Sequence, residues 1–358
     1  MGIYIHIPFC NRICSYCDFP KVLKNDNWID SYLKSLKKEI NQKYKGEEIS
    51  TIYIGGGTPI SLNINQLNKL FEITNIFNLS ENAEITIEVD SEDLTIEKIK
   101  YLKENVNRIS IGIETFDKKR LKELNRTVNI KNIKEAFKYF DNINLDLMYG
   151  FKNQSIKDLE TDLDKIIELN PNHISTYSLI IEPNTKLYIE NYQRLDDDSD
   201  RKMYDLIIKK LKKHNYIHYE TSNFSKPNYE SKHNLTYWNN EKYYGFGLGA
   251  GGYIENIRYE NTRSLNKYIE GNYELESHEL SKEEKVQNEL ILGFRKTKGI
   301  NKQKFKEKYE IDIKDFKDIE ILLKQKVLKE NKKYIYIDNN YQYISNEILV
   351  RFIDLTLP

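Results

Sequence analysis

Short apolar runs alternate with longer amphipathic stretches through the first two-thirds of the chain. The amphipathic stretches carry apolar residues at helical spacing, as in Trp28, Ile29, Tyr32, Leu33, Leu36 and Ile40, and again in Leu67, Leu70, Phe71 and Ile76. The short runs are typical of buried strands, and they cover residues 3–7, 51–54, 85–89, 108–113, 144–149 and 173–181. Repeated βα units of this kind predict a parallel sheet with helices outside it.

Six such units indicate an α/β fold whose sheet closes partly or completely into a barrel. A doubly wound open sheet is the competing prediction, because alternation alone does not decide whether the sheet closes. Parallel barrels build their sites from the carboxyl ends of the strands, and polar or glycine-rich clusters follow most of these strands. The clusters are the cysteine loop, Gly55-Gly56-Gly57-Thr58-Pro59, Glu88-Val89-Asp90, Glu114-Thr115 and Asp146. The pattern favours a barrel with one functional mouth.

The residue pattern changes in the last third of the chain. A helix is predicted from Asp196-Asp197-Asp198 to about His214, and residues 219–253 read as ordered loops. From Ser281 we expect three helices and then a hairpin of residues 334–337 and 341–344 that turns at residues 338–340, which is a winged-helix-like order. We therefore divide the chain into a barrel domain (1–225), junction loops (226–275) and a C-terminal winged-helix-like α+β domain (276–358).

The charge balance and the first residues of the chain argue against several classes of function. The 358 residues include 55 basic and 55 acidic side chains, so no overall attraction to nucleic acid or anionic lipid is implied. Lysines in the tail alternate with acids, which favours a solvated scaffold surface over a nucleic-acid module. The start of the chain lacks signal-peptide features, and no apolar run is long enough to span a bilayer. We expect a cytoplasmic protein.

Three cysteines, Cys10, Cys14 and Cys17, carry the strongest chemical signal. Thiolates at this spacing on one loop can fix three irons of a four-iron four-sulfur (4Fe–4S) cluster and leave the fourth iron without a protein ligand. Such an iron can coordinate S-adenosylmethionine (SAM), whose cleavage starts radical chemistry. The alternative is a structural zinc site, which normally needs four ligands. His6 lies on a predicted strand and is better explained as a packed side chain.

Several motifs together resemble one family. Tyr4-Ile5-His6-Ile7-Pro8-Phe9-Cys10, Cys14-Ser15-Tyr16-Cys17-Asp18-Phe19, the Gly55 run, Arg108-Ile109-Ser110-Ile111-Gly112 and Asp146-Leu147-Met148-Tyr149-Gly150 resemble the coproporphyrinogen-oxidase-like radical SAM proteins over nearly the whole chain. The resemblance implies a radical SAM (β/α) barrel. It also implies SAM contacts from Tyr4, Tyr16, Gly56, Gly57, Thr58, Glu88, Glu114, Arg126, Asp146 and the backbone near Ile180.

Three positions depart from the family pattern. Glu114 stands where a glutamine is usual, Asp90 where an asparagine is common, and Val128 where a histidine often follows the Arg126 motif. Additional acid near the ribose could be harmless, or it could weaken binding of the SAM carboxylate. Whether SAM is turned over stays open on the sequence.

Within the family, the chain resembles the HemW-type haem chaperones. Related oxidases carry a further cysteine where this chain has Phe19, whereas His233-Asn234-Leu235-Thr236-Tyr237-Trp238 matches the HNxxYW signature of the HemW group. The resemblance implies haem as cargo near His233, Tyr237 and Trp238, respiratory haem proteins as recipients and an electron donor. The alternative is a radical SAM enzyme acting on a porphyrinogen. A homodimer and peripheral membrane contact stay open.

A second glycine-rich run, Gly245-Phe246-Gly247-Leu248-Gly249-Ala250-Gly251-Gly252, superficially matches a dinucleotide-binding fingerprint. It lacks a clear following helix and an acidic partner at the required distance, so this function is rejected. We expect a close approach of this loop to the barrel mouth instead.

Overall fold

The computed structural model describes residues 1–353 and 355–357. Its centre is a twelve-stranded sheet in which six parallel strands follow one another in chain order. These strands are β1 (Gly2–Ile7), β4 (Glu48–Gly56), β5 (Asn78–Asp90), β6 (Arg108–Glu114), β7 (Ile143–Tyr149) and β8 (His173–Ser178). All six predicted strands are therefore confirmed.

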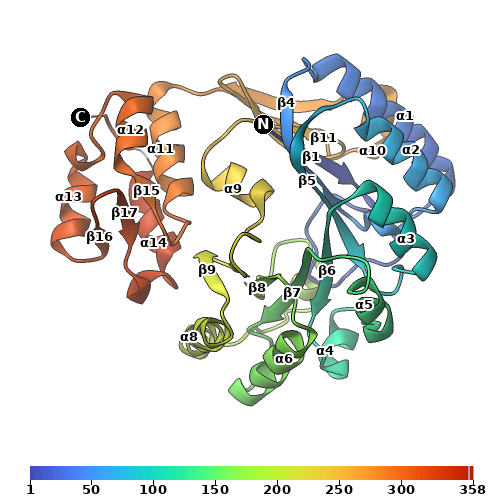
Figure 1. Cartoon of the computed structure of the whole chain (residues 1–358), viewed down its shortest axis with the longest axis horizontal. Helices are drawn as coiled ribbons and strands as arrows, with labels where there is room; N and C mark the ends of the chain where they lie inside the picture. The colour runs from blue at the N-terminus through green and yellow to red at the C-terminus, as the bar shows by residue number, and fades with distance from the viewer. Residues whose placement is uncertain (354, 358) are drawn as a thin grey trace.

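Strand order decides between the two predicted sheets. A doubly wound sheet reverses its order at a switch point, whereas here β1, β4, β5, β6, β7 and β8 are neighbours in sequence order without reversal. The sheet curves with its helices on the outside (Figure 1). They are α1 (Asp26–Lys43), α2 (Ile64–Thr74), α3 (Ile96–Asn105), α4 (Lys118–Glu123), α5 (Ile130–Ala136), α6 (Ile156–Leu169) and α8 (Asp197–Lys213). The short helix α7 (Lys186–Ile189) lies instead against the cysteine loop, where the Leu187 N–H donates to the Ser15 carbonyl. The fold is a partial (β/α) barrel.

The predicted helical stripes form the packed face of these helices. Ile29, Tyr32, Leu33, Leu36 and Ile40 of α1 are all buried in the main hydrophobic core, and the side chain of Asn25 caps the helix by accepting from the backbone N–H of Asn27. Trp28, which the same stripe includes, is 42% exposed. One residue in the first turn of α1 is thus assigned to the wrong face by spacing alone.

Additional strands extend the parallel sheet at both ends. Beyond β8 lie β10 (Asn223–Ser225) and β9 (Ile217–Glu220), both antiparallel to their neighbours. Beyond β1 lie β11 (Tyr243–Phe246), β12 (Gly251–Ile254), β13 (Ile257–Asn261) and β14 (Glu274–Glu279), of which β11 is parallel to β1. Residues 226–275 are therefore not the loops that we expected, because α9 (Lys232–Trp238), α10 (Leu265–Glu270) and these strands occupy most of the segment. The domain boundaries themselves stay a prediction.

The glycine-rich turn between β11 and β12 lies against the cysteine loop, as expected. Gly247 has φ +100°, and a Cβ there would come within 2.5 Å of the His6 carbonyl oxygen. A Cβ on Gly249 would meet Pro20 at 2.4 Å. Since only glycine lets the backbone approach so closely, these residues serve packing of the turn against β1 and the loop.

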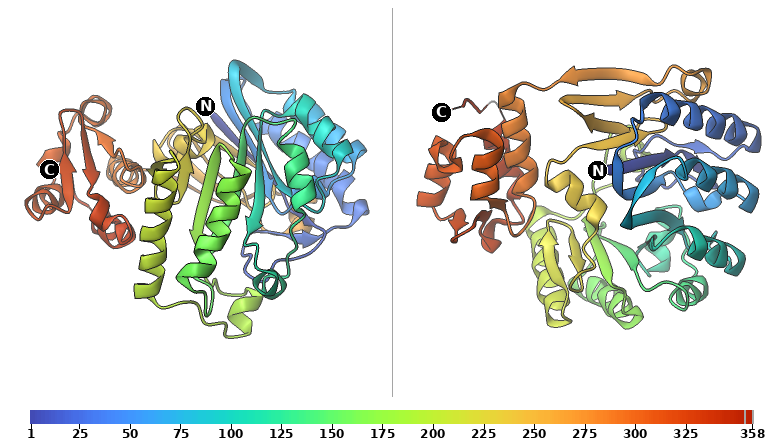
Figure 2. Two further views of the ribbon diagram at one scale, coloured as in Figure 1. Left: turned by 60° about the horizontal axis from the view of Figure 1, so that its bottom comes forward. Right: turned by 45° about the horizontal axis from the view of Figure 1, so that its top comes forward.

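The C-terminal domain has its own core and a small antiparallel sheet beside the barrel (Figure 2). Helices α11 (Lys282–Gly293), α12 (Lys302–Tyr309) and α13 (Lys317–Lys324) are accompanied by β15 (Ile300–Asn301), β16 (Leu328–Glu330) and β17 (Tyr334–Ile337). Short helical turns complete the domain: η2 (Ile313–Asp315), η3 (Asn339–Tyr341), α14 (Ser345–Leu349) and η4 (Val350–Phe352). The predicted three helices are present, and the antiparallel pair β16 and β17 follows them.

The predicted hairpin in this domain is wrong in its second strand. Strand β17 pairs with β16 and β15, and the turn lies at Asn331, whose side chain accepts from the backbone N–H groups of Lys333 and Tyr334. Residues 341–344 leave the sheet, because Asp338 caps the turn η3 and the Tyr343 hydroxyl contacts Asp200 of α8. A contact with the barrel thus replaces the expected strand pairing.

Candidate cluster and cofactor site

The three cysteines lie on the loop that leaves β1, at the carboxyl end of the barrel strands. The loop includes β2 (Phe9–Cys10) and returns through β3 (Val22–Leu23), and the backbone N–H of Ser15 donates to Leu124 at the end of α4. Cys10 is buried, whereas Cys14 and Cys17 are half-buried. Burial raises the pKa of the Cys10 thiol to about 11, so thiolate formation there needs a compensating positive partner such as iron.

Two donors already face the sulfur atoms. The Thr58 hydroxyl donates to Cys10 Sγ at 3.6 Å, and Arg126 Nη1 donates to Cys14 Sγ at 3.6 Å. In residues 1–353 and 355–357, no three His, Cys, Asp or Glu side chains are close enough to hold one metal ion. A structural zinc normally takes four ligands, whereas in a cubane cluster each of three cysteines would bind a different iron, so three thiols on one loop suit the cluster better.

A cavity of about 420 Å³ opens beside the three cysteines. Nine of the ten residues predicted to contact SAM line it, together with all three cysteines: Tyr16, Gly56, Gly57, Thr58, Glu88, Glu114, Arg126, Asp146 and Ile180. Residues more than 160 positions apart in the sequence thus meet at one mouth. The predicted convergence of the strand ends is confirmed.

Tyr4 is the exception. It does not line the cavity, because its hydroxyl bonds to His6 Nδ1 at 2.9 Å and its ring stacks on Tyr53 inside the barrel. His6 bonds through Nε2 to the Pro20 carbonyl and is 2% exposed, so it is a packed strand residue as predicted.

The glycines after β4 form a cradle that admits no side chain. Gly56 has φ +111°, a Cβ on Gly55 would meet the Glu88 carboxylate at 2.8 Å, and one on Gly57 would meet the Pro8 backbone at 2.7 Å. The Gly56 N–H donates to Glu88 Oε2 at 3.0 Å. The run therefore brings backbone close to the carboxylate at the cavity wall.

Two carboxylates line the deeper part of the cavity. Burial raises the pKa of Glu88 to about 7, even though the Tyr53 hydroxyl and the Gly56 N–H donate to it. Burial also raises the pKa of Asp146, which accepts from Asn144 Nδ2 at 2.6 Å. Buried carboxyl groups of this kind can accept hydrogen bonds from an amino group or from sugar hydroxyls.

Arg126 is surrounded by the acids that depart from the family pattern. Its Nη2 lies 3.8 Å from Glu114 and 3.7 Å from Asp90, and it donates to the Gly112 carbonyl at 2.9 Å. Burial raises the pKa of Glu114 to about 7, although Arg126 lowers it. Val128, the third departure, is a partly buried residue packed against the core.

The cavity also contains side chains that sequence reasoning missed. Arg12 bonds to both carboxylate oxygens of Asp90 at 3.4 Å, while Met148 and Tyr177 line the wall from β7 and β8. The sequence offered a signal for Arg12, because this residue lies inside the cysteine motif. It offered none for Met148 and Tyr177, which look like ordinary strand residues. Only the curvature of the sheet brings them to the mouth.

The HNxxYW motif lies elsewhere. Helix α9 sits within the curve of the sheet near the amino ends of the strands, where Glu84 accepts from the N–H groups of Lys232 and His233 (Figure 1). His233 is 1% exposed, with Nδ1 bonded to Thr51 at 2.9 Å and Nε2 to Tyr237 at 2.8 Å. Burial lowers the pKa of His233 to about 3. Both ring nitrogens are thus engaged, and the predicted haem ligation by His233 has no geometric support in this conformation.

No helix in residues 1–353 and 355–357 combines the length and apolar character needed to span a bilayer.

Comparison with known proteins identifies the family. The family model of the Radical SAM superfamily matches residues 4–166. "Heme chaperone HemW" of Bacillus subtilis (strain 168) is 38% identical, with 98% of each chain covered, and that of Lactococcus lactis is 38% identical, with 98% of this chain and 96% of the relative covered. A solved structure of Escherichia coli coproporphyrinogen III oxidase (HemN) superposes with a TM-score of 0.86 at 21% identity over 98% of this chain and 89% of that one, which shows a shared fold. The chain belongs to the HemW family of the radical SAM superfamily.

Proposed function

We propose that this protein is a haem chaperone that carries a 4Fe–4S cluster on Cys10, Cys14 and Cys17 and binds SAM in the adjoining cavity. The observation that carries the proposal is full-length similarity to proteins named heme chaperone, combined with three thiols beside a cavity rich in polar groups. Respiratory haem proteins are the proposed recipients.

The chain's own residues would hold SAM in a defined orientation. Backbone at Gly56 and Gly57 and the carboxyl groups of Glu88 and Asp146 offer acceptors for an amino group and hydroxyls, and Arg126 offers a guanidinium for a carboxylate. A bound cluster supplies one-electron chemistry to SAM.

Haem transfer tests the chaperone proposal directly. Protein reconstituted without oxygen and loaded with hemin is expected to restore activity to a haem-depleted respiratory enzyme, and the same protein without hemin is not. Loss of carboxyl groups from coproporphyrinogen, matched by 5′-deoxyadenosine release, would instead establish the radical enzyme alternative.

Glu114→Gln is expected to tighten SAM binding about fivefold at pH 8, or roughly 1 kcal/mol. Glutamine removes a charge that competes with the SAM carboxylate for Arg126. Because the pKa of Glu114 is about 7, its carboxyl group is mostly protonated at pH 6, and the advantage of the variant should largely disappear there. Anaerobic calorimetric titration at both pH values measures this. Weaker binding at both would show that Glu114 is itself an acceptor for SAM.

A further inference from the structure

The Glu88 carboxylate at the wall of the SAM cavity is held by two donors from the neighbouring strand. Glu88 belongs to β5, whereas both donors belong to β4: the Tyr53 hydroxyl donates to Oε1 at 2.8 Å and the Gly56 N–H to Oε2 at 3.0 Å. Because each oxygen accepts one of these bonds, the carboxylate is fixed in one orientation. Of the two donors, only the Tyr53 hydroxyl belongs to a side chain and can be removed by substitution.

The Tyr53 ring is itself held between two other rings inside the curve of the sheet. It stacks on Tyr4 of β1 with the ring centroids 6.3 Å apart and on His233 of α9 with the centroids 5.2 Å apart. Tyr4 and Tyr53 lie directly opposite each other on paired strands, so their side chains share the inner face of the sheet. Tyr53 does not line the SAM cavity, and its contact with that cavity is the hydrogen bond to Glu88.

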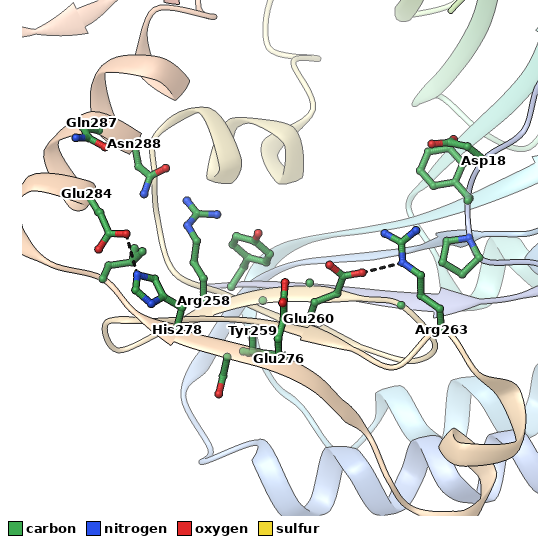
Figure 3. A pocket seen from close by; sticks show the side chains of 18 residues that line it. Asp18, Arg258, Tyr259, Glu260, Arg263, Glu276, His278, Glu284, Gln287 and Asn288 are labelled. Atoms are coloured by element: carbon green, nitrogen blue, oxygen red, sulfur yellow. Dashed lines mark hydrogen bonds and ion pairs between the residues drawn. The ribbon is translucent and has the colours of Figure 1, made fainter. Parts of the chain in front are cut away.

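Ring contacts continue from His233 to the surface of the molecule. His233 Nε2 bonds to the Tyr237 hydroxyl at 2.8 Å, and the rings of Tyr237 and Tyr243 meet nearly at right angles with their centroids 4.6 Å apart. Tyr243 lies at the wall of a second cavity, of about 780 Å³, between strands β11–β14, the start of α11 and residues 18–20 (Figure 3). A column of rings thus runs from this second cavity, through the HNxxYW helix, to the wall of the SAM cavity.

The Tyr53 hydroxyl also favours the charged form of Glu88. Burial raises the pKa of Glu88 to about 7, and donation from Tyr53 and from the Gly56 N–H opposes this rise. An ionised carboxylate is acceptor-only, and each of its oxygens keeps capacity for a further donor, such as an amino or hydroxyl group of SAM. Loss of the Tyr53 hydroxyl would therefore leave Glu88 less ionised and less well oriented.

We infer that Tyr53 is a positioning residue of the SAM site, which holds Glu88 toward the ligand, and that the HNxxYW helix supports Tyr53 through the ring of His233. The inference rests on the proposed binding of SAM in the cavity beside the cysteines. The supporting contact uses the face of the imidazole ring and neither of its nitrogens. A motif at the amino ends of the strands thereby contributes to a site at their carboxyl ends.

Tyr53→Phe is the first test, because it removes the hydroxyl and keeps the stacked ring. In anaerobic calorimetric titration of the cluster-reconstituted protein, it should weaken SAM binding about fivefold, as expected for one lost hydrogen bond to a charged group. Its iron and sulfide contents should equal those of the parent. Tyr216→Phe is the matched control, since Tyr216 is also buried and its hydroxyl donates to the Pro171 carbonyl away from the cavity. It should bind SAM as the parent does.

A double-mutant cycle separates positioning of Glu88 from a general structural effect. Glu88→Ala alone should weaken SAM binding about tenfold, because it removes an acceptor for the ligand. Adding Tyr53→Phe to Glu88→Ala should change binding by less than about twofold, because the hydroxyl then has no carboxylate to orient. Two losses that simply multiply would show that Tyr53 affects SAM by another route and would overturn the inference.

His233→Ala tests the support from the HNxxYW helix. Removal of the ring that stacks on Tyr53 should weaken SAM binding about threefold at unchanged iron content. His218→Ala is the control, because His218 stacks on Phe224 with the centroids 4.5 Å apart and neither residue lines the SAM cavity. If Tyr53→Phe and His233→Ala both bind SAM as the parent does, the inference is wrong while the SAM site stands. If the parent binds no SAM, the proposed SAM site itself fails.

Discussion

After anaerobic reconstitution, Cys14→Ser protein is expected to contain at most about one-fifth of the iron and sulfide of the parent. The reason is that a cubane held by three thiolates does not survive the loss of one. Cys14 belongs to the half-buried part of the loop, and Arg126 already donates to its sulfur. Iron and sulfide analysis together with electron paramagnetic resonance of the reduced protein measures the effect.

The matched control for this experiment is Asn11→Ala. Asn11 lies on the same loop and its side chain donates to Asp93, so its removal perturbs the loop without removing a thiol. The control should keep nearly all of its iron. Equal iron contents in Cys14→Ser and the parent would contradict the cluster assignment, and zinc alone in the parent would do so as well.

Glu39→Ala is expected to destabilise the barrel domain by about 4 kcal/mol, because it leaves buried donors without an acceptor. The Glu39 carboxylate is fully buried and accepts from the Gly247 N–H at 2.9 Å, Asn261 Nδ2 at 2.6 Å and the Tyr268 hydroxyl at 2.6 Å. Lys43 pairs with it at 2.9 Å. These bonds fasten α1 to the turn after β11, to β13 and to α10.

Urea unfolding followed by circular dichroism, with hydrogen exchange to assign the barrel, measures this loss. Lys38→Ala is the control, since Lys38 is the exposed neighbour of Glu39 on the same helix and its replacement should change stability by less than about 0.5 kcal/mol. Equal midpoints for the two variants would show that the Glu39 network contributes little net stability.

Local sequence patterns determined the parallel α/β core. Residues such as Ile3, Ile5 and Ile7 repeat within short runs, and Leu33, Leu36 and Ile40 repeat at helical spacing, because burial on one face of an element imposes its period on the chain. The same logic located the cluster ligands, since three thiols within eight positions have few chemical uses in one loop. The strand ends then indicated where the cofactor residues would meet.

Contacts between segments that are distant in the chain could not be predicted from such local patterns. The hairpin of residues 341–344 failed because Tyr343 bonds to Asp200 of the barrel, a partner 143 positions away. Loops were expected for residues 226–275 because the short Gly- and Tyr-rich strands of this segment lack the alternation of apolar and polar residues that marks a strand. Strand β11 forms nonetheless, because it pairs with the distant strand β1.

The histidines show most clearly which features the sequence reveals and which only the folded chain reveals. The motif around His233 drew attention by sequence, whereas its two hydrogen bonds and burial, set by Thr51 and Tyr237, exist only in the folded chain. His173 belongs to no motif, yet it too is buried, with Nδ1 bonded to Asn144 and Nε2 to Tyr219. Sequence alone determined the elements and the thiol ligands, because both depend on residues near one another in the chain. Tertiary structure decided which polar side chains are engaged or accessible, because that depends on partners brought together by the closing sheet.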